Sequence, residues 1–161
     1  MAKRKRGSKL LVIDASVLRA SGGMGAVHPT ASQCRDFLIA VLEICHRVIL
    51  SDSAHDEWKT HASKFARSWW VSMLARRKVE RVEGSVDDEV RRPLERTNLT
   101  DKQRAAIEKD LHLIEDALRA HRIIVGIDLR LTEYVEQAGE RARKLRTIHF
   151  VDPRKVTADK L

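Results

Sequence analysis

The chain has 161 residues, of which 43% are hydrophobic and 34% charged, a composition typical of one folded domain and not of a disordered or fibrous protein. No apolar run approaches the roughly 20 residues that a membrane-spanning helix needs, and the basic N-terminus is not followed by the apolar stretch of a secretory signal. We therefore expect a cytoplasmic protein with no membrane partner.

The formal net charge is +8, and five of the 31 basic residues lie within the first nine positions. No structural pattern precedes Lys9, so we expect residues 1–8 to form a basic disordered arm. Such an arm either attracts phosphates without specificity or only aids solubility, and both interpretations remain open. The folded domain is then expected over residues 9–153, followed by a C-terminal tail over 154–161.

The first half of the domain alternates between short apolar runs and helical patterns. Residues 10–13 are apolar and partly β-branched, which predicts a strand buried on both faces. Pro29 should open a helix that ends near Cys45. A second strand is expected over 47–50, then one long helix over 54–76, then a short extended piece over 79–82.

The second half repeats this alternation. Thr100 and Gln103 form a capping-box pattern, which predicts a helix that starts there and runs to about Ala120. Before it we expect a polar helix over 86–96. After it we expect a strand over 122–127, a helix over 131–145, and a last strand over 147–151.

Strands that alternate with helices predict an α/β fold, here a three-layer sandwich with a mainly parallel central sheet. Ligands of such sheets bind beyond the carboxyl ends of the strands. Asp14 directly follows the predicted strand over 10–13, and Asp128 follows the predicted strand over 122–127. Two carboxylates in one crevice repel each other unless a cation offsets their charge, and oxygen ligands suit Mg²⁺ or Mn²⁺.

Other acidic residues are candidates for the same crevice. Glu57 lies early in the helix after the second strand, where Asp52 and Asp56 are alternatives to it. Asp110 lies on the rim of an apolar helix face, so we expect it to be half-buried beside the sheet. Asp116 is six residues further on, about 120° away around the helix, and is expected to point to solvent; it remains an alternative acid.

Four segments resemble, in order and spacing over about residues 9–153, the motifs of the PIN-domain family. In residues 11–18, Leu-Val-Ile-Asp-Ala-Ser-Val-Leu, an apolar run ends in Asp-x-Ser. In residues 110–118, an aspartate is followed by a helical Ala-Leu. Residues 122–128 are similar to the strand that closes the family's site, and residues 148–153 to its short terminal strand. Gly126 is a departure, because many members carry Ser or Thr two positions before the last aspartate.

The resemblance implies that Asp14, Glu57, Asp110 and Asp128 bind the metal and that Ser16 supports the metal or the scissile phosphate. It implies a Mg²⁺- or Mn²⁺-dependent endoribonuclease that hydrolyses RNA phosphodiester bonds, in which metal-bound water supplies hydroxide. PIN proteins of this size resemble the toxins of VapC-type toxin–antitoxin pairs. An antitoxin protein and a second copy of the chain are therefore expected partners. A free-standing RNA-processing nuclease is the nearest rival.

Outside this class, the main alternative is a catalytically silent PIN-fold module that binds RNA or protein. A phosphotransfer enzyme with a strand-end nucleophile is a weaker alternative, because Asp14-Ala15-Ser16 lacks the Asp-x-Asp of one such class. Three tryptophans, at 58, 69 and 70, could stack on bases, but their helical spacing favours core or dimer contacts. Basic residues between 64 and 78 fit an RNA path and a solvated helix face equally well.

Overall fold

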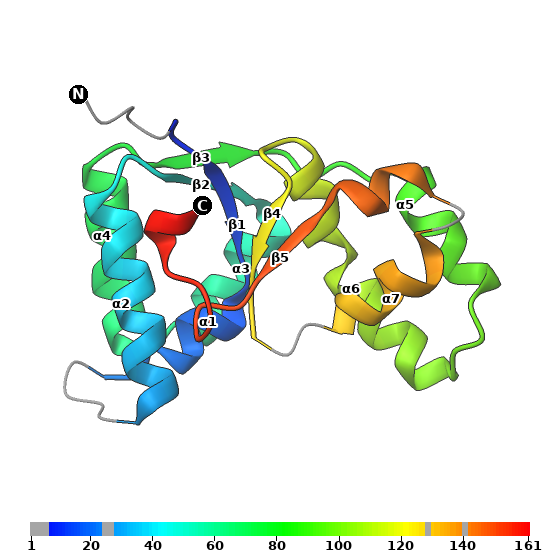
Figure 1. Ribbon diagram of the computed structural model, residues 1–161, viewed down its shortest axis with the longest axis horizontal. Coiled ribbons are helices and arrows are strands. Elements are labelled where there is room, and N and C mark those ends of the chain that lie inside the picture. The colour runs from blue at the N-terminus through cyan, green and yellow to red at the C-terminus, as the bar shows by residue number, and fades with distance from the viewer. Residues whose placement is uncertain (1–6, 24–27, 128–129, 140–141) are drawn as a thin grey trace.

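Five parallel strands form the centre of the molecule, with helices on both faces (Figure 1). The computed structural model describes residues 7–23, 28–127, 130–139 and 142–161. The strands are β1 (Leu10–Ile13), β2 (Arg47–Ser51), β3 (Val79–Val82), β4 (Ile123–Val125) and β5 (His149–Val151). Their order in the sheet is β3-β2-β1-β4-β5, and every neighbouring pair is parallel. The predicted α/β three-layer sandwich is therefore confirmed.

Two hydrophobic cores lie on opposite faces of this sheet. In β1, Leu11 and Ile13 belong to one core, and Leu10 and Val12 belong to the other, as the two-residue period of a strand requires. The first core is covered by α1 (Ala15–Ala20), α2 (Pro29–Glu43), α3 (Asp52–His61) and α4 (Lys64–Ala75). The second is covered by the α-helices α5 (Asp88–Arg91), α6 (Asp101–Leu118) and α7 (Arg130–Ala138) and by two 3₁₀ helices, η1 (Arg92–Arg96) and η2 (Arg143–Thr147). A central strand buried on both faces explains the continuous apolar run at residues 10–13.

Helix lengths are where the sequence-based expectations were wrong. The helix expected over 54–76 is two helices, α3 and α4, because Ser63 caps the second: its Oγ accepts a hydrogen bond from the Ala66 amide at 3.1 Å. The helix expected over 131–145 ends at Ala138, and the end of that range lies instead in the 3₁₀ helix η2. In the segment 86–96, the α-helix has only four residues before η1, which contains Pro93.

The ends of the chain differ in what the structure describes. The expected basic arm lies mostly outside the described residues, since the first six are not among them. Residues 154–161, which we expected as a tail, include η3 (Ala158–Lys160), whose Ala158 is fully buried against the first core. The buried His46 donates from Nε2 to the Ala158 carbonyl at 3.0 Å. Within the described part of the chain, no helix is long and apolar enough to cross a membrane.

The tryptophans contribute mainly to the core. Trp58 and Trp69 are buried, and their ring nitrogens donate to the carbonyls of Ile13 (2.9 Å) and Leu38 (2.6 Å). Trp70 is half-buried and packs edge-on against Trp58, with ring centroids 5.3 Å apart. These contacts favour the core interpretation over base stacking, and the bond from Trp58 also fixes the end of β1 next to Asp14.

Candidate functional site

Asp14 stands where β1 ends and α1 begins. Its backbone amide donates to the Val125 carbonyl at 2.8 Å, which joins the carboxyl ends of β1 and β4. Its side chain caps α1, because Oδ2 accepts from the Ser16 amide at 3.2 Å. Two bonds therefore hold this carboxylate at the edge of the sheet where ligands of parallel sheets bind.

Three of the four predicted metal-binding acids line one pocket. Asp14, Glu57 and Asp110 reach it from the end of β1, from α3 and from α6, and the pocket has a volume of about 420 Å³. The other residues that line it are Ala15, Ser16, Arg19, His61, Ala106, Lys109, Ile127 and Arg130. Asp128, the fourth predicted acid, lies outside the described residues, but its neighbour Ile127 is part of the lining.

The charges in this pocket act on one another. Burial, and to a smaller extent the negative charges of Asp14 and Glu57, raise the pKa of Asp110 to about 6. His112 and Lys109 oppose the shift but do not cancel it. Asp110 is half-buried, as its place on the rim of the apolar helix face predicted. The carboxylates of the pocket are therefore close enough to act on one another, and the basic residues of its lining, Arg19, Lys109 and Arg130, do not cancel that effect.

Glu57 lies beside a histidine that sequence reasoning missed. The Nε2 atom of His112 is 3.9 Å from Oε2 of Glu57, and it is buried without a hydrogen-bond partner in the described structure. The other ring nitrogen, Nδ1, is 3.0 Å from the Lys109 carbonyl, which can only accept, so Nδ1 carries a hydrogen. The imidazole thus approaches the carboxylate from inside the protein. This is a contact between α3 and α6, and residue spacing within either helix does not reveal it.

The alternative acids lie elsewhere. The prediction that Asp116 points to solvent was wrong: this residue is 1% exposed, and its Oδ2 accepts from the Ser51 hydroxyl at 2.5 Å. Burial raises its pKa, and it is not part of the pocket lining. The side chains of Asp52 and Asp56 are 74% and 80% exposed, and Asp52 pairs with Arg81 at 2.9 Å. Neither lines the pocket, whereas Glu57 does.

Ser16 connects two segments of the site. Its Oγ accepts a hydrogen bond from the Ile127 amide at 3.2 Å, so the first turn of α1 holds the backbone that directly precedes Asp128. Gly126 is buried, and its amide donates to the Val151 carbonyl at 3.0 Å. Position 126 carries no side-chain hydroxyl, and the Ser16 hydroxyl contacts the backbone one residue further along.

The residues fit a hard divalent cation by type. Their carboxylate oxygens are the ligands that Mg²⁺ and Mn²⁺ prefer, and among the described residues no lysine or arginine nitrogen lies within 4.0 Å of Asp14, Glu57 or Asp110. In the same part of the chain, no three side chains of His, Cys, Asp or Glu are already placed closely enough to hold a metal ion.

Comparison with known proteins assigns no family. No family model matches the chain, and the search of curated proteins finds no relative. The function is therefore inferred from the residues of the pocket and from the motifs at residues 11–18 and 110–118.

Proposed function

We propose that this protein is a metal-dependent endoribonuclease that hydrolyses RNA phosphodiester bonds with Mg²⁺ or Mn²⁺. One observation carries the proposal: Asp14, Glu57 and Asp110 come from three distant parts of the chain and line one pocket at the carboxyl ends of the strands. The raised pKa of Asp110, due in part to the other two acids, supports a shared negative field. The PIN-like motifs around Asp14 and Asp110 point to the same chemistry.

Each group in the pocket has a role in this proposal. Asp14, Glu57, Asp110 and Asp128 would hold the metal, which when bound supplies a hydroxide-like water near neutral pH and charge to neutralise the phosphodiester. Asp110 is suited to orient that water, because a carboxylate with a raised pKa accepts a hydrogen bond or proton more readily than an ordinary one. The remaining lining includes Arg19, Lys109 and Arg130, whose charges suit RNA phosphates.

Cleavage of RNA by the purified full chain tests the proposal. We expect single-stranded RNA to be cut with Mn²⁺, the reaction to stop with excess chelator, and added Mn²⁺ to restore it. Asp14→Asn and Asp128→Asn should abolish cutting while the circular dichroism spectrum stays that of the wild type. Asp56→Asn is the matched control, because its side chain is 80% exposed and outside the pocket, and it should cut normally. Equal activity of Asp14→Asn and the wild type would refute the proposal.

Calorimetry separates the nuclease from a silent module of the same fold. A nuclease should bind Mn²⁺ with an affinity that Asp14→Asn weakens, whereas a silent RNA- or protein-binding module should show no such binding. As a biological role we propose the toxin of a toxin–antitoxin pair, which the motifs and the size of the chain support. Growth arrest on expression of the wild type, and none with Asp14→Asn, is the expected result; normal growth with both would contradict that role.

A further inference from the structure

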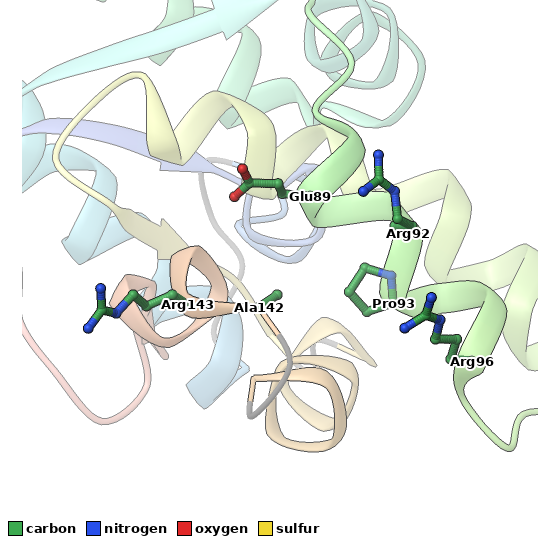
Figure 2. Close-up of a pocket in the computed structure, with 6 residues that line it drawn as sticks. All are labelled: Glu89, Arg92, Pro93, Arg96, Ala142 and Arg143. Atoms are coloured by element: carbon green, nitrogen blue, oxygen red, sulfur yellow. The ribbon is translucent and has the colours of Figure 1, made fainter.

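A second charged surface lies around η1 and η2, away from the acidic pocket. It consists of two adjoining hollows. The first, of about 400 Å³, lies between η1 and η2 and is lined by Glu89, Arg92, Pro93, Arg96, Ala142 and Arg143 (Figure 2). The second, of about 360 Å³, is lined by Ser85, Asp87, Glu115, Leu118, Arg119, Arg122, Arg143, Lys144 and Thr147. Arg143 lines both, so the hollows form one continuous surface.

Five arginines line these hollows, at positions 92, 96, 119, 122 and 143; we call this set the arginine surface. Figure 2 shows Arg92 and Arg96 projecting from one wall of the first hollow and Arg143 from the other, with Pro93 and Ala142 between them. The guanidinium of Arg143 points away from Arg92 and Arg96, as its place in both linings requires.

The acids beside the arginine surface lie next to basic residues outside the set of five, although Asp87 and Glu89 share one lysine. The buried Glu115 pairs with Arg91 at 2.5 Å, and Asp87 pairs with Lys144 at 3.0 Å. Glu89 is 3.6 Å from the same lysine. Within the described residues, none of the five arginines has a carboxylate partner. The guanidinium of Arg119 donates to the Glu83 carbonyl, which carries no full charge, so the positive charges of the five arginines remain available to an external anion.

The backbone at Arg122 gives independent support. This residue joins α6 to β4 in a left-handed conformation (φ 61°), which glycine or asparagine adopts at much lower cost than arginine. The conformation is fixed from both sides, because the Arg122 amide donates to the Ala117 carbonyl at 3.0 Å and its carbonyl accepts from the His149 amide at 2.8 Å. Neither the packing of the helix nor the reversal of the chain requires an arginine at this position. An arginine in a costly conformation therefore indicates that its side chain has a function.

We infer that the arginine surface is a second contact site for RNA, which binds the phosphate backbone of the substrate at the end of the sheet opposite the acidic pocket. Arg119, Arg122 and Arg143 precede β4 or β5, whereas the acidic pocket follows β1 and β4. Planar guanidinium groups suit phosphate oxygens. A protein partner is less suited, because no aromatic residue is among those that line the two hollows and interface centres are rich in aromatic anchors. The inference rests on the proposed function, since it takes RNA as the ligand.

Arg122→Gly tests the inference, with Arg77→Gly as its control. Arg77 is the other residue outside glycine with positive φ (55°) in the described chain; it is exposed and lies between α4 and β3. Both changes remove one charge and relax one left-handed residue, so both variants should fold with an unchanged melting temperature to within a few degrees. Binding of a fluorescein-labelled single-stranded 30-nucleotide RNA is measured by anisotropy in chelator, where no cleavage occurs.

We expect Arg122→Gly to weaken RNA binding about fivefold and to lower the slope of log Kd against log salt by about 1, and Arg77→Gly to change neither. A double variant, Arg92→Gln with Arg143→Gln, should weaken binding further than Arg67→Gln with Arg77→Gln. A six-nucleotide RNA, too short to reach both sites, should be cut equally well by the wild type and by Arg122→Gly.

The inference is overturned if Arg122→Gly and Arg77→Gly weaken binding alike, or if the wild type binds the 30-nucleotide RNA no better than Arg122→Gly does. The proposed function fails in a different way. RNA that binds through Arg122 but is not cut with Mn²⁺ would sink the nuclease and leave the arginine surface intact. RNA that is cut normally by Arg122→Gly, at an unchanged KM for the long substrate, would sink the surface and leave the nuclease intact.

Discussion

The two ends of the parallel sheet differ in the sign of the charged groups that lack an ion-pair partner. At the carboxyl ends, Asp14, Glu57 and Asp110 share a pocket and have no lysine or arginine within 4.0 Å among the described residues. At the amino ends of β4 and β5, the buried Glu115 is paired with Arg91 at 2.5 Å, and the positive charge is in excess. Each end thus has charged side chains of one sign that lack a direct ion-pair partner among the described residues.

The presence or absence of an ion-pair partner distinguishes carboxylates that stabilise the fold from carboxylates that are suited to bind a cation. A buried charge is costly unless it is paired, so a structural acid is expected to have its partner in place, as Glu115 has. Asp116 is an intermediate case, because a neutral hydroxyl, that of Ser51, is its hydrogen-bond donor. The pKa of Asp110 is raised by burial and, unlike that of Asp116, also by two carboxylates of the same pocket, Asp14 and Glu57, which is the behaviour expected of a site that an external cation completes.

The largest expected effect separates two aspartates of α6. Asp110→Asn removes a proposed metal ligand, and we expect RNA cleavage with Mn²⁺ to fall at least about 100-fold. Asp116→Asn is the matched control. It makes the same change six residues further along the same helix, at a buried residue outside the pocket, and should alter cleavage by less than about threefold once the folded fraction is equal. A loss with Asp116→Asn as large as with Asp110→Asn would contradict the assignment of the site to Asp110 and not to Asp116.

The second prediction concerns stability at the neutralised end. Glu115 is 3% exposed and accepts from both Nε (3.0 Å) and Nη2 (2.5 Å) of Arg91. Glu115→Gln should lower the free energy of unfolding by about 2–3 kcal/mol, because it leaves Arg91 without its anion, while cleavage is unchanged after correction for folded protein. Urea denaturation measures this. Glu89→Gln, at a side chain that is 66% exposed, should cost under about 0.5 kcal/mol, and equal costs would contradict the comparison.

The third prediction is that the contribution of Asp110 to stability rises as pH falls, the reverse of what an ion-paired carboxylate does. The pKa of Asp110 is raised from 3.8 to about 6 in the folded protein. Between these values the folded state binds the proton and the unfolded state does not, so this group should stabilise the protein as pH falls from about 7 to about 4. Asp110 is half-buried, and after allowance for solvent screening the contribution is about 1–2 kcal/mol.

Unfolding in chelator at pH 7.5 and pH 5 measures that contribution as the difference between the wild type and Asp110→Asn. The variant should be the more stable protein at pH 7.5 and should lack this part of the gain at pH 5. Mn²⁺ should bind the wild type more weakly below about pH 6, because Asp110 takes up a proton there. Stability curves that run parallel for the two proteins would show that the repulsion in the pocket is too small to matter.

Much of the sheet and of the acidic pocket could be predicted from local sequence. The run Leu10–Ile13 is apolar at every position because both faces of β1 are buried. The end of this run marks the end of the strand and so places Asp14 directly after it. Asp110 was expected on the rim of an apolar helix face and is half-buried there. The Thr100–Gln103 capping box fixed the start of α6, and both of its hydrogen bonds are present.

What could not be predicted depends on contacts between distant segments. Asp116 is buried because a hydroxyl at the end of β2 reaches it, and nothing in the spacing of α6 marks that neighbour. His112 approaches Glu57 across two helices. Arg92, Arg122 and Arg143 belong to three separate connections, and only the packing of η1, η2 and the α6–β4 turn gathers them on one surface. Periodicity assigns residues to faces of one element and cannot identify the element opposite.

The smallest predicted effect tests whether the acidic end needs a rigid backbone as well as its charges. Ser16→Ala leaves the Ile127 amide without its acceptor at 3.2 Å. The site is half-buried, so water can replace the hydroxyl, and we expect a loss of about 0.5–1 kcal/mol in the free energy of unfolding.

Cleavage by Ser16→Ala should fall by about three- to tenfold at saturating Mn²⁺, because the segment that precedes Asp128 loses its tie to α1 and a displaced ligand costs rate. Ser72→Ala is the control, since the Ser72 hydroxyl donates only to the Ser68 carbonyl one turn earlier in α4, and both measurements should stay at the wild-type value. Lower stability with unchanged cleavage in Ser16→Ala would assign Ser16 to the fold alone. The activity of the carboxyl end would then depend on its carboxylates and not on the hydrogen bond between Ser16 and Ile127.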